Sequence, residues 1–199
     1  MDKQIIISIS REYGSGGHYI ADRLAKELNM EILDHNLLDQ IAAERDINLE
    51  EYKKYDEAPK KRLFTRTVRG LSNSMEDIVA EMQFDYIKEK AATGKSMIIV
   101  GRCADALLKD YKGLIKIFIE GDMKDKVDRI KYVRKMDTDE AKRAIERHDN
   151  NRRRYHNMYC DTKWGDSRYY DICINSSRLG LDETEKLLKD YILKYAEKL

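Results

Sequence analysis

Residues 4–20 read QIIISISREYGSGGHYI, and this stretch decides the fold. The isoleucine-rich run from Gln4 to Ile9 predicts a strand, and a glycine-containing stretch at 13–17 follows it. Between residues 19 and 28 apolar residues recur at every fourth position, which predicts a helix. The opening of the chain is therefore a strand, a tight loop and a helix.

Four further runs of strand length follow, each bounded by glycine or polar residues. They are Glu31–Asp34, Ser96–Val100, Leu114–Ile119 and Asp171–Ile174. Segments with helical periodicity separate these runs, and the longest lie between the second and third strands and between the fourth and fifth. Five strands that alternate with helices predict an α/β fold in which a parallel sheet is covered on both faces.

The composition restricts the class of protein. The chain has 199 residues, enough for one domain with a substantial core. Charged residues make up 38% but the net charge is only +1, so a surface of mixed sign is expected, which argues against a nucleic-acid partner. No stretch approaches the roughly 18 consecutive apolar residues of a membrane span, and no signal-peptide pattern precedes the first strand. We therefore expect a soluble, cytoplasmic protein with no membrane partner.

The segment 10–17 has features of a phosphate-binding loop. Glycines let backbone N–H groups turn toward an anion, and the following helix presents its positive N-terminus. The motif GxxxxGK[ST], aligned on Gly16, requires glycine, lysine and a hydroxyl residue where this chain has Arg11, Gly17 and His18. A tight strand-to-helix turn without a ligand therefore stays an open alternative. Arg11 lies in the loop, so its guanidinium can supply the missing charge.

Further basic residues fall where a phosphate site is expected. Arg102 follows the third strand, and open parallel sheets bind ligands beyond the carboxyl ends of their strands. The alternative for Arg102 is a surface ion pair with Asp105. The helix expected over 138–158 carries a dense group of arginines, which is either a solvated face or a mobile lid over the transferred phosphoryl group. We favour the lid because a phosphate site is expected nearby.

Four segments jointly resemble the cytidylate-kinase-like family, and they occur in the family's order. They are residues 7–17, 100–105, 149–164 and 170–180. The first resembles the family's opening loop, which reads SRE, an aromatic residue and GSGG, and the second resembles its GRGAD segment. The third resembles the lid region, and the fourth resembles the C-terminal strand and loop. The resemblance covers nearly the whole sequence.

This resemblance implies the three-layer P-loop NTPase fold of nucleoside-monophosphate kinases, with a five-stranded parallel sheet of order 2-3-1-4-5. It implies one domain over residues 1–199, with a helical NMP-binding insertion at about 35–93 and a lid at about 121–168. The implied activity is phosphoryl transfer from ATP, with Mg²⁺, to a nucleoside monophosphate, CMP or dCMP. Two alternatives stay open: a kinase-fold protein that binds a nucleotide without turnover, which the missing lysine favours, and a kinase of another small molecule. A homo-oligomer also stays open.

The expected site residues form three groups according to role. The residues expected to act on the transferred phosphoryl group are Arg11, Arg102, Arg147, Arg152 and Arg153. The residues expected to bind ATP are Ser10, Arg11, Glu12, Tyr13, Gly14, Ser15, Gly16, Gly17, His18 and Arg178. The residues expected to bind the acceptor are Asp34, Arg102, Asp105 and Asp149. No metal ligand is assigned, and base recognition is open among Arg62, Arg66, Arg69, Asp77 and Gln83.

Overall fold

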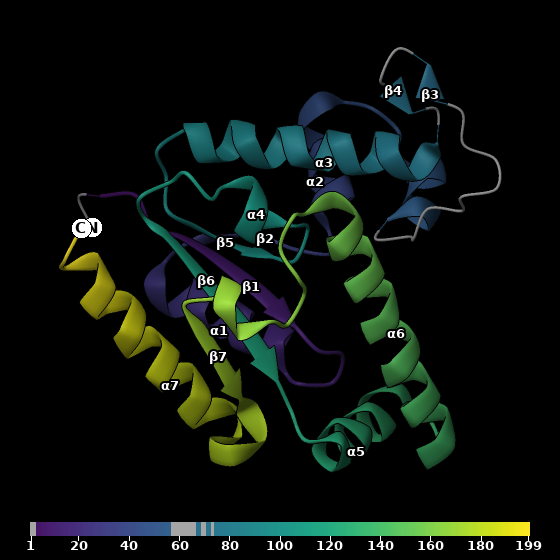
Figure 1. The fold of residues 1–199 in the computed structure, drawn as a ribbon, viewed down its shortest axis with the longest axis vertical. Coiled ribbons are helices and arrows are strands. Elements are labelled where there is room, and N and C mark those ends of the chain that lie inside the picture. Colours follow the sequence, from purple (N-terminus) through teal and green to yellow (C-terminus); the bar gives the residue numbers. More distant parts are fainter. Residues whose placement is uncertain (1–2, 57–66, 69–70, 73) are drawn as a thin grey trace.

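The computed structural model describes residues 3–56, 67–68, 71–72 and 74–199. Its centre is a five-stranded parallel sheet in the order β2-β5-β1-β6-β7 (Figure 1). The strands of this sheet are β1 (Ile6–Arg11), β2 (Glu31–Leu33), β5 (Met97–Val100), β6 (Leu114–Glu120) and β7 (Ile172–Asn175). Numbered along the chain these strands have the order 2-3-1-4-5, so the prediction of the fold is confirmed.

Helices cover both faces of the sheet. They are α1 (Gly17–Leu28), α2 (Leu37–Arg45), α3 (Met75–Ala92), α4 (Ala104–Leu107), α5 (Met123–Arg134), α6 (Thr138–Tyr159) and α7 (Ser176–Ala196). Two short 3₁₀ helices are η1 (Glu50–Tyr55) and η3 (Ser167–Tyr169). β3 (Thr67–Val68) and β4 (Leu71–Ser72) form a small antiparallel pair, which the sequence pattern does not predict. None of the described helices is long and apolar enough to cross a membrane.

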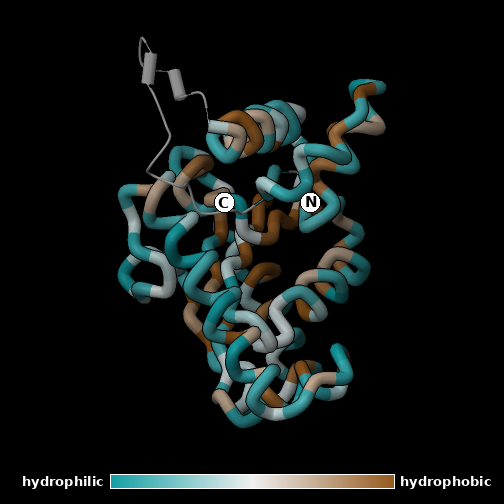
Figure 2. Tube along the Cα trace, turned by 90° about the vertical axis from the view of Figure 1, so that its right-hand side faces the viewer, coloured by the Kyte–Doolittle hydropathy of each residue, from teal (hydrophilic) through white to brown (hydrophobic). Residues whose placement is uncertain are grey.

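The central strand β1 is buried along its whole length because its side chains point alternately into two cores. Ile7 and Ile9 belong to a cluster with α1 and α7. Ile6 belongs to the other cluster, with α2 and α3. Figure 2 shows hydrophobic residues concentrated along the segments at the centre of the molecule. The two clusters make the three layers that the sequence predicts.

α5 and α6 pack against each other on the side of the sheet toward which the strand arrows point (Figure 1). Val127 and Ile130 of α5 form a small buried cluster with Ile145 of α6. A capping box fixes the start of α6: Asp137 accepts a hydrogen bond from the N–H of Glu140 at 2.8 Å, and the Glu140 carboxylate accepts one from the N–H of Asp137 at 3.0 Å. The pair of helices is thus held beside the carboxyl ends of the strands.

Element boundaries near the loop differ from the expected ones. Ser10 and Arg11 pair with β6 and end strand β1, because β6 continues the ladder past residue 9. Helix α1 begins at Gly17, two residues earlier than expected. α7 begins at Ser176 and is kinked at Gly180, whereas the pattern places its start at residue 181. The loop itself is therefore only residues 12–16.

Candidate nucleotide-binding site

The loop between β1 and α1 leads the chain from the sheet into the helix, and a glycine stands immediately before the helix. Gly16 has a φ of 82°, in the left-handed region that glycine favours. A Cβ at this residue would also overlap the side chain of Leu181. Within the described residues, the N–H groups of Gly16, Gly17 and His18 meet no hydrogen-bond acceptor. These groups are therefore available to an anion at the N-terminus of α1.

Arg11 occupies the space that a lysine at residue 17 would need. It is the last residue of β1, and it is only 8% exposed. A Cβ added to Gly17 would lie 2.6 Å from the Arg11 Cβ and 3.0 Å from its Cγ, which is too close for both side chains to fit. An arginine at residue 11 and a lysine at residue 17 therefore exclude each other in this backbone.

Side chains of α5 and α6 hold the loop from the opposite side. Glu12 accepts a hydrogen bond from Lys126 Nζ at 2.8 Å. Asp149 Oδ1 accepts one from the N–H of Tyr13 at 2.6 Å, and Asp149 Oδ2 lies 3.6 Å from Lys126 Nζ. Glu12 and Asp149 thus have protein partners in this structure, and their expected contacts with ATP and the acceptor stay predictions.

Four arginines line a cleft of about 430 Å³ beside the loop. They are Arg11 of β1, Arg129 and Arg134 of α5, and Arg152 of α6. Arg152 Nη1 also donates to the carbonyl oxygen of Arg11 at 3.2 Å. Arg129 and Arg134 were not expected, although the alternation of basic and apolar residues over 123–135 was a signal for them. The cleft therefore concentrates positive charge next to the free N–H groups.

Four expected arginines do not line this cleft: Arg102, which is buried elsewhere, and three exposed ones. Arg147 is exposed on α6. Arg153 is exposed, and its guanidinium lies over the ring of Trp164, 5.2 Å from the ring centroid. Arg178 is exposed, 3.4 Å from an oxygen of Asp122. Catalytic or ATP-binding roles for these three residues stay predictions.

Arg102 and Asp105 are both buried and belong to separate pairs. Arg102 is 3% exposed and donates to Asp56 Oδ2 at 2.7 Å. Asp105 Oδ2 lies 2.9 Å from His156 Nε2 of α6. Burial opposes the charged imidazole, but hydrogen bonds with Asp105 and Cys160 raise the pKa of His156 to about 10. The alternative of a surface ion pair between Arg102 and Asp105 is therefore wrong.

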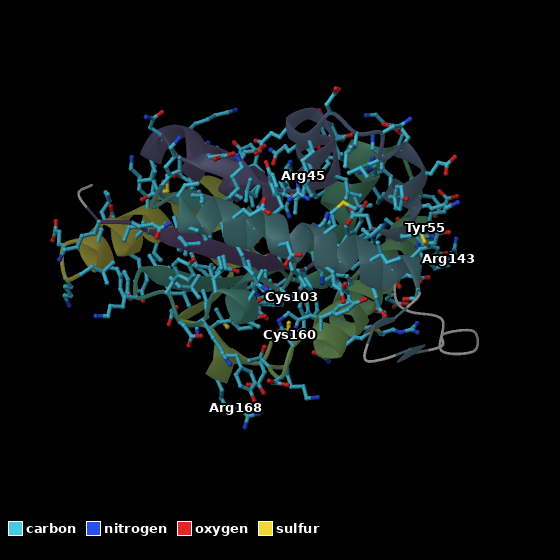
Figure 3. The ribbon with its side chains drawn as sticks, turned by 90° about the horizontal axis from the view of Figure 1, so that it is seen from above. Arg45, Tyr55, Cys103, Arg143, Cys160 and Arg168 are labelled. Carbon is cyan, nitrogen blue, oxygen red and sulfur yellow. The ribbon has the colours of Figure 1, made fainter. Side chains whose placement is uncertain are left out.

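A second cleft, of about 550 Å³, is lined by residues of α3, by α4 with Asp105, and by the segment that follows α6. Cys103 and Cys160 both line it and lie close together (Figure 3). The hydrogen bond with Cys103 and the neighbouring His156 lower the pKa of Cys160 to about 7, although burial acts in the opposite direction. This cleft therefore holds a thiol that is partly ionised near neutral pH.

Two of the five residues considered for base recognition lie within the described part of the chain. Arg62, Arg66 and Arg69 lie outside the described residues. Asp77 accepts a hydrogen bond from the Tyr159 hydroxyl at 2.6 Å, which joins α3 to the end of α6. Gln83 donates to Asp56 at 3.0 Å. A role for Asp77 or Gln83 in recognising a base stays a prediction.

A histidine stands where the phosphate-loop motif has a hydroxyl residue. His18 Nδ1 lies 2.5 Å from Asp34 Oδ2, and His35 Nδ1 lies 3.0 Å from the same oxygen. Burial acts to raise the pKa of Asp34, but the hydrogen bonds with both imidazoles hold it well below its usual range. The hydrogen bond with Asp34 raises the pKa of His18.

These residues do not fit the Mg²⁺ site that the phosphate-loop motif supplies. Mg²⁺ prefers oxygen ligands in near-octahedral geometry. Ser15, the hydroxyl residue within the loop, is fully buried and donates to the carbonyl of Glu12 at 2.9 Å. The carboxylate of Glu12, the other oxygen ligand in the loop, accepts hydrogen bonds from Lys126 and from the N–H of Gly121. The loop therefore does not reproduce the motif's Mg²⁺ site, and we assign no step to that ion.

Comparison with known proteins adds information on sequence relatives. The model of the cytidylate kinase-like family matches residues 6–178. The chain is 25% identical over 201 residues to a cytidylate kinase of Pyrobaculum islandicum, covering 98% of each protein. It is 27% identical over 195 residues to a cytidylate kinase of Methanopyrus kandleri, covering 93% of this chain and 91% of the relative.

Solved structures also resemble this fold. An uncharacterized protein from Eubacterium ventriosum is 35% identical with a TM-score of 0.75, covering 95% of this chain and 98% of the other. A shikimate kinase from Bacteroides thetaiotaomicron is 14% identical with a TM-score of 0.55, covering 94% of this chain and 98% of the other. The likeness to the second protein concerns the fold alone.

Proposed function

This chain belongs to the cytidylate kinase-like family and is a phosphotransferase, and we propose that it transfers the γ-phosphoryl group of ATP to a nucleoside monophosphate, CMP or dCMP. The observation that carries the proposal concerns residues 11 and 17. Arg11 fills the space that a side chain at residue 17 would need, and it supplies the positive charge that the motif's lysine would have supplied. Relatives named cytidylate kinase, matched over nearly the whole chain, support the choice of acceptor.

In the proposed complex the triphosphate of ATP lies in the arginine-lined cleft. The N–H groups of Gly16 and Gly17 donate to phosphate oxygens at the start of α1, as at other helix N-termini that bind phosphate. Arg11 and Arg152 face the same cleft and neutralise charge on the transferred group. Because an arginine fork donates two parallel hydrogen bonds, it holds a phosphate in one orientation, which a lysine does not.

The acceptor's phosphate is proposed to lie between Arg11 and Arg102. Together with Arg152 of α6, these residues line a gap of about 10 Å³, which holds about one water molecule. A monophosphate can enter only if α6 moves away from the end of β5. We therefore propose that residues 121–168 are a lid and residues 35–93 the acceptor-binding insertion, and that closure of the lid excludes water from the transfer.

The proposal is tested by measuring ADP release, in a coupled assay, against a panel of nucleoside monophosphates. We expect turnover with CMP or dCMP above the other monophosphates. Binding of ATP by calorimetry without ADP release for any acceptor would favour a nucleotide-binding protein without turnover, an alternative that His18 and Gly17 keep open. Turnover only with a non-nucleotide acceptor would assign the chain to another class of small-molecule kinase.

Arg11→Ala tests the site itself. We expect kcat/KM to fall by about 100-fold or more, the scale on which one electrostatic donor in an active site acts. The matched control is Arg45→Ala, because Arg45 lies on α2, is paired with Glu89 at 2.8 Å and does not line the arginine-lined cleft. An Arg11→Ala enzyme as active as the Arg45→Ala enzyme would show that Arg11 does not replace the lysine.

A further inference from the structure

Three side chains beside the phosphate loop converge on one point. Asp34, the residue after β2, is 6% exposed. His18 Nδ1 and His35 Nδ1 approach the same oxygen of Asp34, at 2.5 Å and 3.0 Å. One ligand-type atom from each of the three residues lies within 4.8 Å of the others. The two imidazole rings meet edge to face, with centroids 5.2 Å apart. Two imidazoles and one carboxylate thus bring their ligand-type atoms together at one point.

This set of groups is one that binds metal ions in other proteins. Two histidines and one carboxylate on one side of an ion, with open positions on the other, form a facial triad that suits divalent transition metals. We propose that His18, Asp34 and His35 bind one divalent cation of this class, such as Mn²⁺, Co²⁺ or Zn²⁺. Imidazole nitrogen suits these ions, whereas Mg²⁺ prefers oxygen ligands alone.

A carboxylate lies near the second nitrogen of the first of these ligands. His18 Nε2, the nitrogen turned away from Asp34, lies 3.5 Å from Asp22 Oδ2, one turn further along α1. Histidines that bind metals typically donate their other N–H group to a carboxylate, which fixes the tautomer and strengthens the ligand. The contact with Asp22 leaves Nδ1 of His18 as the nitrogen that faces the ion.

The two imidazoles are open to the cleft, although the carboxylate between them is buried. The side chains of His18 and His35 are 49% and 66% exposed, and both line the arginine-lined cleft. An ion there would have open positions toward the cleft, where phosphate oxygens could complete its coordination. That last role rests on the proposed function, while binding of the ion does not.

The test uses Co²⁺, whose visible absorption reports its ligands. The full-length chain without an affinity tag is stripped of metal with a chelator and titrated with Co²⁺ in the absence of nucleotide. We expect saturation at one ion per chain, and excess Mg²⁺ should not displace it. His18→Asn and His35→Asn should each weaken binding by at least about 10-fold, and Asp22→Asn by about 10-fold. The control is His148→Asn, because His148 stacks on Tyr13 outside the three-residue cluster.

The outcomes separate this proposal from the proposed function. No saturable binding, or equal affinities for wild type, His18→Asn and His35→Asn, would overturn the metal site whatever the enzyme does with ATP. An intense thiolate-to-cobalt band would place the ion at Cys103 and Cys160 and would also overturn it. Variants that fail to bind are first compared with wild type by urea unfolding, and only variants with wild-type stability count as evidence for the ligands.

Discussion

Replacing Gly17 by alanine should change protein stability in a direction that depends on residue 11. In the wild type the new Cβ would lie 2.6 Å from the Cβ of Arg11, and that atom cannot move away because it is fixed to the central strand. Overpacking of this kind costs about 1–3 kcal/mol. The φ of Gly17 is not among the positive ones, so the backbone accepts alanine without strain.

Removing the arginine side chain should reverse the effect. In an Arg11→Gly background both close contacts vanish, and alanine should then stabilise the chain by about 0.5–1 kcal/mol through its helix propensity and the lower entropy of the unfolded state. The coupling free energy between the two positions is the difference between these effects, about 1.5–4 kcal/mol. Urea unfolding of the wild type, the two single variants and the double variant measures it, provided that all four have the same m-value.

Gly121→Ala is the matched control for this cycle. Its added Cβ would meet neighbours at 3.4–3.5 Å, an ordinary van der Waals distance. We therefore expect Gly121→Ala to change stability equally whether residue 11 is arginine or glycine. If Gly17→Ala also has the same effect in both backgrounds, Arg11 does not fill the space of a lysine, and the central support for the proposed nucleotide site is lost.

Two further predictions concern the pairs beside Arg102. The ion pair with His156 should make wild type more stable than Asp105→Asn by about 3 kcal/mol below pH 6.5. This advantage should decline above that pH and be lost by about pH 10, the raised pKa of His156, as measured by urea unfolding; a difference independent of pH would contradict a charged His156. Cys160 should be alkylated by iodoacetamide with a midpoint near pH 7, read by peptide mass spectrometry, and His156→Asn should raise that midpoint. Equal labelling of Cys160 and Cys173 at pH 7 would argue against a lowered pKa of Cys160, because burial raises the pKa of Cys173.

The sheet could be predicted from the sequence because its strands carry local signals. The residues of β5 are apolar in one unbroken run, and those of β1 are rich in isoleucine and buried at every position, as strands covered on both faces require. The order of the strands came from the family resemblance, since periodicity does not report which strands are neighbours. The end of β1 was misplaced because pairing with β6 extends it through Arg11, and that pairing joins residues more than a hundred positions apart.

The site could be predicted only in part, because local sequence signals locate some of its residues and long-range packing locates the others. Arg11 ends the strand of the opening strand-loop-helix unit, so its place near the loop is a local consequence. Asp34 follows β2, and the carboxyl ends of parallel strands lie at one edge of the sheet. Arg102 pairs with Asp56 across 46 positions, and Asp105 meets His156 across 51. Such pairings depend on how α6 and the segment before α3 dock on the sheet, which no local pattern encodes. His35 was overlooked because, read alone, it resembles an ordinary polar residue at a helix start.

The second half of helix α6 carries contacts with two separate parts of the protein. The 22 residues of the whole helix span about 33 Å. Asp149 and Arg152, near its middle, contact Tyr13 of the loop and the carbonyl of Arg11, while His156 and Tyr159, in its last turn, contact α4 and α3. Because one rigid helix carries both sets of contacts, a tilt that changes one set must disturb the other, so the affinities for the proposed donor and acceptor are expected to be coupled in both directions.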